Sequence, residues 1–210
     1  MKELNSTEHE YSDLIADAIR EYLDNDDWHY KFDDELGVFN AGIAVGSKIQ
    51  HVQLNIQVGE KDFTCYFKLP LAATKEVRRK VVEYITRANY GLKNGNFELD
   101  YNDGEIRYKT FVPVLDDAAP SEELIRFSIF VGVAMVSRYS DGIAEVIFNI
   151  KEPLEAIVEA ESPKEYNDID DDIDDDDDIE DEVDEEIDED IDDDIDEDVD
   201  EEVDEEEEDK

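Results

Sequence analysis

The stretch NFELDYNDGEIRYKT, residues 96–110, decides the fold of this chain because its pattern predicts a β-hairpin. Apolar and polar side chains alternate on both sides of Asp103-Gly104, a dipeptide typical of a two-residue type I′ turn. Such a turn would gather apolar residues on one face and pair opposite charges on the other. The pairs that it predicts are Phe97–Thr110, Leu99–Tyr108, Tyr101–Ile106, Glu98–Lys109 and Asp100–Arg107.

A second hairpin is predicted over residues 51–69, where apolar and polar residues alternate on both sides of a turn at residues 59–62. Closing that turn places the apolar rows of both strands on one face. The single cysteine, Cys65, then belongs to the hydrophobic core. Two further short strands are predicted at residues 28–32 and 38–45. The pairs predicted for the second hairpin are Val58–Phe63, Ile56–Cys65 and Leu54–Phe67.

Helical periodicity predicts three main helices. The first runs over residues 8–23, behind a capping box that begins at Thr7, and the second runs over residues 75–90. The third begins after Ser121 and is apolar on nearly all sides over residues 124–136. Such a helix needs cover from the sheet on one side and from a further helix or a second subunit on the other. Shorter helices are predicted at residues 141–150 and 154–160.

The order of these elements indicates the fold class. It is one helix, three or four strands, a helix, two strands and a helix, without regular alternation of single strands and helices. This order predicts an α+β domain over residues 1–160, with an antiparallel sheet and helices packed on one face. A body of that length can bury a sizeable core.

The charge of the chain is concentrated at one end. The formal net charge is −45, and residues 161–210 carry −33 of it, with 35 acidic residues and two lysines. We expect residues 161–210 to be a disordered Asp/Glu-rich tail, because such a segment is too charged to collapse. The body carries the remaining −12.

This charge favours basic or cationic partners and argues against nucleic acid, whose binding needs Lys and Arg to neutralise phosphates. Residues 1–11 contain no apolar signal segment, and the longest apolar run is too short to cross a bilayer. One cysteine makes no disulfide framework and no thiolate zinc cluster. We therefore expect a soluble, cytoplasmic protein that binds neither nucleic acid nor membrane.

Residue types that carry chemistry do not converge in this sequence. His9, His29 and His51 lie on separate predicted elements, without metal-binding spacing. An EF-hand comparison at residues 24–35 fails because His29 stands where the loop needs glycine. A core position would leave Cys65 unreactive. We expect no catalytic residue, no metal and no cofactor, and hence no enzyme.

Two features of the sequence each allow two interpretations. Basic residues gather on the second helix, among them Arg78 and Arg79, and form either an ordinary solvent face or an anion-binding surface for the acidic tail. In the tail, aliphatic residues recur every fourth position over residues 179–203. They are either a by-product of a short repeat or spaced anchors for a basic, partly apolar partner.

Residues 81–114, which include the segment NYGLKNGNFELDYNDGEIRYKTFVPV, resemble the central motif of the YbjN family of bacterial sensory-transduction regulators. The resemblance covers roughly residues 11–139. It implies an α-β-β-β-α-β-β-α body similar to type III secretion chaperones, often a homodimer, that binds other proteins. The candidate interaction residues, from the motif, its hairpin and the basic helix, are Asn89, Tyr90, Phe97, Arg78, Arg79 and Arg107.

Two functional hypotheses follow. In the first, the chain is a non-enzymatic protein-interaction module, chaperone-like or regulatory, that binds a client or regulatory protein through its sheet or helix grooves. This hypothesis predicts an exposed apolar patch of several hundred Å². In the alternative, the acidic tail is a polyanion that sequesters a basic protein or mimics nucleic acid.

Overall fold

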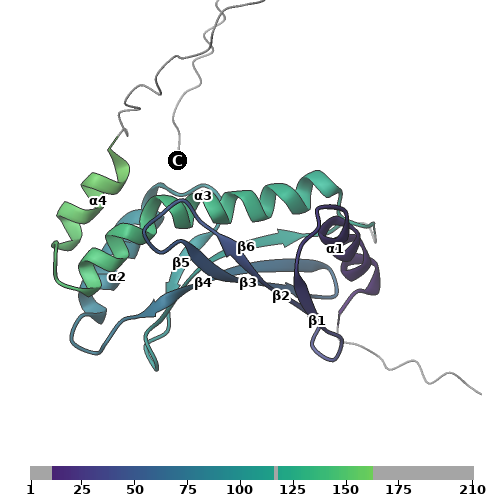
Figure 1. Ribbon diagram of the computed structural model, residues 1–210, viewed down its shortest axis with the longest axis horizontal. Coiled ribbons are helices and arrows are strands. Elements are labelled where there is room, and N and C mark those ends of the chain that lie inside the picture. The colour runs from purple at the N-terminus through teal and green to yellow at the C-terminus, as the bar shows by residue number, and fades with distance from the viewer. Residues whose placement is uncertain (1–10, 116–117, 163–210) are drawn as a thin grey trace, which may run out of the picture. The chain divides into compact units, whose positions relative to one another are not determined.

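The structure is a computed structural model, and it describes residues 11–115 and 118–162. The capping box at Thr7 and the predicted tail, apart from its first two residues at 161 and 162, therefore lie outside the described residues. The described part contains ten elements (Figure 1). They are α1 (Asp13–Asn25), β1 (Tyr30–Asp33), β2 (Val38–Ala44), β3 (His51–Val58), β4 (Asp62–Ala72), α2 (Arg78–Gly91), β5 (Asn96–Leu99), β6 (Glu105–Pro113), α3 (Glu122–Ile147) and α4 (Pro153–Glu161).

The strands form one antiparallel sheet in the order β1-β2-β3-β4-β6-β5. The predicted α+β class with an antiparallel sheet is confirmed. The register of β3 on β4 matches the prediction at every pair, with Ile56 opposite Cys65. Cys65 is fully buried, as predicted. Four strands precede α2 in the described part of the chain, one more than the family resemblance implies.

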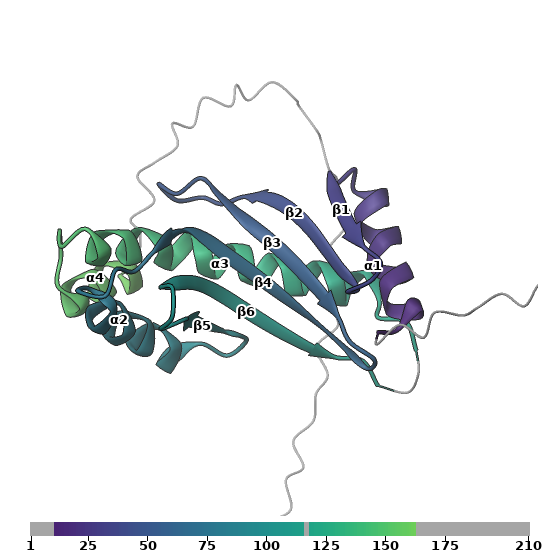
Figure 2. The same ribbon diagram turned by 90° about the horizontal axis from the view of Figure 1, so that it is seen from below.

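One face of the sheet carries the core, and α3 packs across it (Figure 1). Alternate residues of the central strands, such as Leu54, Phe67 and Tyr108, point to this face and are at most 1% exposed. Figure 2 shows the strands in front of α3, so the other face of the sheet is seen without a helix over it. That uncovered face has polar rows, for example Asn55, Tyr66 and Lys109 on adjacent strands.

Glycines let α3 approach its neighbours closely. A Cβ atom at Gly132 would lie 1.9 Å from the Phe67 ring, and one at Gly142 would lie 2.2 Å from the Tyr84 hydroxyl. That hydroxyl donates a hydrogen bond to the main-chain oxygen of Tyr139, 3.0 Å away. The aromatic side chains of the core thus occupy the space that larger helix residues would need.

The turn predicted for the β5–β6 hairpin was wrong. Phe97 pairs with Tyr108, a register shifted by two residues, and residues 101–104 form a four-residue loop. Contacts from outside the hairpin hold this loop: the Ala73 N–H donates to Gly104 O over 2.8 Å. Arg78 also donates to Tyr101 O over 2.5 Å. The two-residue shift preserves the faces but changes the partners.

Several helix boundaries differ from the prediction, and α2 begins at Arg78 rather than at residue 75. Helix α1 begins at Asp13 rather than residue 8, because Ser12 is its N-cap and accepts a hydrogen bond from the Ile15 N–H. The predicted break in the third helix before residue 141 is absent, and α3 is one helix of 26 residues. Ser137 and Asp141 of this helix accept hydrogen bonds from the loop that joins β2 to β3. The N-cap at Ser121 is confirmed.

Candidate protein-interaction site

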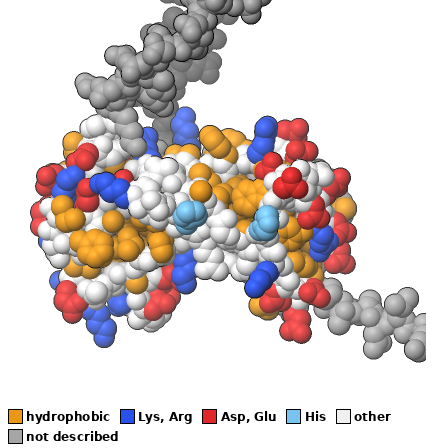
Figure 3. Space-filling model, in the orientation of Figure 1, with side chains coloured by type: hydrophobic (Ala, Val, Ile, Leu, Met, Phe, Trp, Pro, Cys, Tyr) orange, Lys and Arg blue, Asp and Glu red, His pale blue; other side chains and the backbone are white. Residues whose placement is uncertain are grey.

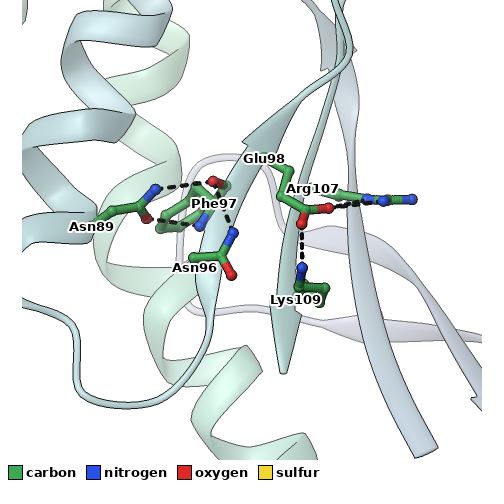
Figure 4. A network of polar contacts seen from close by, with 6 residues as sticks. All are labelled: Asn89, Asn96, Phe97, Glu98, Arg107 and Lys109. Carbon is green, nitrogen blue, oxygen red and sulfur yellow. Dashed lines mark hydrogen bonds and ion pairs between the residues drawn. The ribbon is translucent and has the colours of Figure 1, made fainter. Parts of the chain in front are cut away.

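The asparagine of the family segment fixes the outer edge of the sheet. Asn89, near the end of α2, accepts a hydrogen bond from the Phe97 N–H over 2.8 Å and donates one to the Phe97 carbonyl over 3.0 Å (Figure 4). Its amide therefore satisfies both outward-facing main-chain groups of Phe97, as a neighbouring strand would. Asn89 has a structural role at this edge.

The loop before β5 is equally constrained. Gly95 has φ +76°, and a Cβ atom there would lie 2.3 Å from the main-chain oxygen of Lys109. The Tyr108 hydroxyl donates a hydrogen bond to Asn94 O across the same loop. The residues that make the segment recognisable thus build the joint between α2, β5 and β6.

Arg107 belongs to a charge cluster on the uncovered face of the sheet. Glu98 accepts hydrogen bonds from Arg107 over 2.8 Å and from Lys109 over 2.5 Å (Figure 4). Partial burial alone would raise the pKa of Glu98, but the hydrogen bonds from Lys109 and Arg107 lower it. The Arg107 guanidinium also lies 4.2 Å from the centre of the Tyr66 ring.

The six candidate residues do not form one surface. Phe97 is buried at 2% exposure and contributes to the core. Arg78 is also buried and donates a hydrogen bond to Ala73 O over 3.0 Å, which joins α2 to the end of β4. Arg79 is exposed near the start of α2, and Tyr90 is 96% exposed near its end. Arg79 and Tyr90 thus lie on α2, whereas Arg107 lies on β6.

Helix α3 has an exposed apolar face whose residues the sequence did not identify individually. Leu124, Phe127 and Phe130 are 38%, 53% and 66% exposed. They line one shared hollow of 660 Å³, which Glu123 and Arg126 flank. We call these three side chains the outer α3 patch. The all-round apolar composition of residues 124–136 was its signal in the sequence.

A groove adjoins this patch. It measures 540 Å³ and lies between the far end of β6, the loop before β5 and α3. Its apolar lining includes Val112, Leu124, Phe127 and Val131, and Lys93 is among its polar residues. Because β5 pairs β6 only as far as Lys109, the rest of that edge of β6 is left without a neighbouring strand in the described part of the chain.

The described residues show little that resembles a catalytic or metal-binding site. Burial raises the pKa of the Cys65 thiol to about 12, against a smaller effect of a hydrogen bond with Thr110. Within residues 11–115 and 118–162, no three His, Cys, Asp or Glu side chains are grouped so as to hold a metal ion. No helix of this part is long and apolar enough to cross a membrane.

Comparison with known protein families finds a match over most of the described residues. Residues 16–145 match the family model of YbjN, described as "Putative bacterial sensory transduction regulator". The chain belongs to the YbjN family. Its match spans α1 to most of α3, so the sheet, the α2–β5 joint and the outer α3 patch all lie within the family region. The family description is that of a regulator and names no reaction.

A solved structure is also similar to this YbjN-family chain. It is "Crystal structure of YbjN, a putative transcription regulator from E. coli", at 11% sequence identity and a TM-score of 0.46. The similarity covers 64% of this chain and 89% of that one. No curated protein matches the chain.

Proposed function

We propose that this chain is a non-enzymatic, cytoplasmic regulatory protein that binds a partner protein through the outer α3 patch. The observation that carries the proposal is the exposure of three large apolar side chains, Leu124, Phe127 and Phe130, along one face of a helix. Contiguous apolar surface of this kind is costly in water and is typical of interaction sites. Membership of a family of regulators supports the same conclusion.

The surroundings of the patch favour a protein as its partner. Phe127 and Phe130 are aromatic, a residue type enriched at the centres of protein interfaces. Glu123 and Arg126 flank them, which gives the patch a charged border. The adjoining groove offers the unpaired edge of β6 next to apolar side chains, so that a partner can add main-chain hydrogen bonds as well as apolar contacts.

Charge substitution in the patch tests this proposal. We expect Phe127→Glu/Phe130→Glu to abolish capture of a specific partner from native cell extract, because a carboxylate cannot be desolvated in an apolar interface. Phe148→Glu is the matched control, since Phe148 is 63% exposed at the end of α3 and outside the patch. Mass spectrometry identifies the captured protein, and binding is then repeated with that protein purified. Equal capture by both variants would refute the proposal.

A second copy of the chain is another possible occupant of the patch, as the expectation of a homodimer implies. Sedimentation equilibrium of the wild type and of Phe127→Glu/Phe130→Glu distinguishes the two occupants. A dimer that the substitutions dissociate assigns the patch to self-association, whereas a wild-type monomer leaves the patch to a different protein.

The acidic tail supports a second candidate function. With 35 acidic residues among the last 50, residues 161–210 could sequester a basic protein. Binding by the tail should weaken steeply as salt is raised, and should be lost in a chain that ends at Ser162. Binding by the outer α3 patch should survive both changes, because it depends on apolar contact.

A further inference from the structure

The uncovered face of the sheet carries a groove of 840 Å³ across β1, β2, β3 and β4. Its floor includes Lys31, Asn40, Gln53 and Lys68, which alternate along their strands with residues that point to the core. The groove therefore opens on the opposite face of the sheet from α3. An inference about it does not depend on the function proposed for the outer α3 patch.

This groove is an exception to the charge of the molecule. Of the 210 residues 64 are acidic, yet none of the described residues that line the groove is Asp or Glu. Lys31, Lys68, His29 and His51 do line it. Figure 3 shows the two described histidines, in pale blue, on one face with only apolar and uncharged surface between them. The local charge is thus complementary to an anion.

The lysines of the groove differ in their present partners. Lys31 is exposed and has no ion pair in the described structure, whereas Lys68 forms an ion pair with Glu105 on β6. Trp28 also lines the groove, and its indole N–H donates a hydrogen bond to Asp26 over 2.8 Å. An anion in the groove therefore meets Lys31 directly and competes with one carboxylate for Lys68.

The spacing of the two lysines determines the kind of anion. Lys31 and Lys68 lie three strands apart, and their positions are offset by two residues along the strands. With about 4.8 Å between strands and about 3.3 Å per residue, their Cα atoms are roughly 16 Å apart. An extended peptide spans this distance with carboxylates four or five residues apart, so that each lysine can pair with its own carboxylate.

We infer that this groove binds an extended acidic segment of a partner protein, with one carboxylate at Lys31 and a second, four or five residues away, at Lys68. Gln53 lies between the lysines and offers an amide to the main chain of such a segment. The body carries a net charge of −12, so it repels a peptide with two or three carboxylates less than it repels a nucleic acid, which carries one negative charge at every nucleotide.

Fluorescence anisotropy of the full chain with short labelled peptides tests the inference at low salt. The probe carries two glutamates four residues apart, and its reference carries glutamines instead. We expect Lys31→Gln to weaken binding of the probe about two- to fivefold, the effect of one exposed ion pair. Glu105→Gln should strengthen it by a similar factor, because Lys68 is then released from its present partner. Lys75→Gln, at an exposed lysine outside the groove, should change nothing.

Three outcomes would overturn the inference. The first is equal affinity for the glutamate and glutamine peptides. The second is probe binding that does not change in Lys31→Gln or in Glu105→Gln. The third is tighter binding of a single-stranded oligonucleotide that Lys31→Gln weakens in the same way, which would assign the groove to nucleic acid. Phe127→Glu/Phe130→Glu should leave probe binding unchanged, so failure here is distinct from failure of the proposed function.

Discussion

Gly95 shows how a single residue of the family segment is determined by geometry rather than by a partner. Its φ of +76° belongs to the left-handed region that favours glycine. The main-chain oxygen of Lys109 also occupies the place of a side chain. Gly91, four residues earlier, has neither constraint, since no described atom outside its chain neighbours and its own helix backbone lies within 4 Å of the position of a Cβ atom there.

This contrast leads to a prediction about stability. Gly95→Ala should lower the free energy of unfolding by at least about 1–2 kcal/mol, because alanine at positive φ is strained and its methyl group meets Lys109 O. Gly91→Ala should be neutral or stabilising by up to about 1 kcal/mol, since Gly91 is the last residue of α2. Urea unfolding measures both, and equal effects of the two substitutions would contradict this account of Gly95.

At the scale of elements, Glu98 stabilises the pairing of β5 with β6. Its carboxylate lies on β5 and accepts hydrogen bonds from Arg107 and Lys109, both on β6. These hydrogen bonds lower the pKa of Glu98 in the folded state in spite of its partial burial. A lowered carboxyl pKa stabilises the fold above the unfolded-state pKa, and this stabilisation is lost as the pH falls through the folded-state pKa.

The corresponding prediction compares Glu98→Gln with the wild type over a range of pH. The wild type should be more stable at pH 7, and its advantage should diminish as the pH falls below about 4.3, the usual pKa of a glutamate in an unfolded chain. Urea unfolding at several pH values gives the difference. Glu60→Gln, in the exposed turn between β3 and β4, is the control. An advantage that is constant from pH 7 to pH 3 would contradict the role of the carboxylate.

The two predicted hairpins show which elements can be read from sequence. The register of β3 on β4 was correct because apolar alternation on both strands and a short turn determine it locally. The β5–β6 register was not, because Ala73 and Arg78 hold residues 101–104 from outside the hairpin. The continuity of α3 was missed for a similar reason, since its polar residues bind the β2–β3 loop.

At the scale of the whole molecule, the candidate sites were less predictable than the fold. The sequence indicated that the third helix needs a second cover, but not that Phe127 and Phe130 would remain exposed. Which side chains are exposed depends on how α3 lies on the sheet. Similarly, the groove on the uncovered face is lined by residues of four strands, so no local pattern in the sequence could predict it. Neither surface could be inferred from the net charge of −45.

The most direct test of the outer α3 patch is photocrosslinking in the native cell extract. A photoreactive amino acid is placed at position 127, and at position 148 as the control. We expect one discrete crosslinked protein at position 127, retained at high salt and absent at position 148, because only the patch contacts the partner. No adduct at position 127, or the same adducts at both positions, would contradict the central claim that this face of α3 binds a protein.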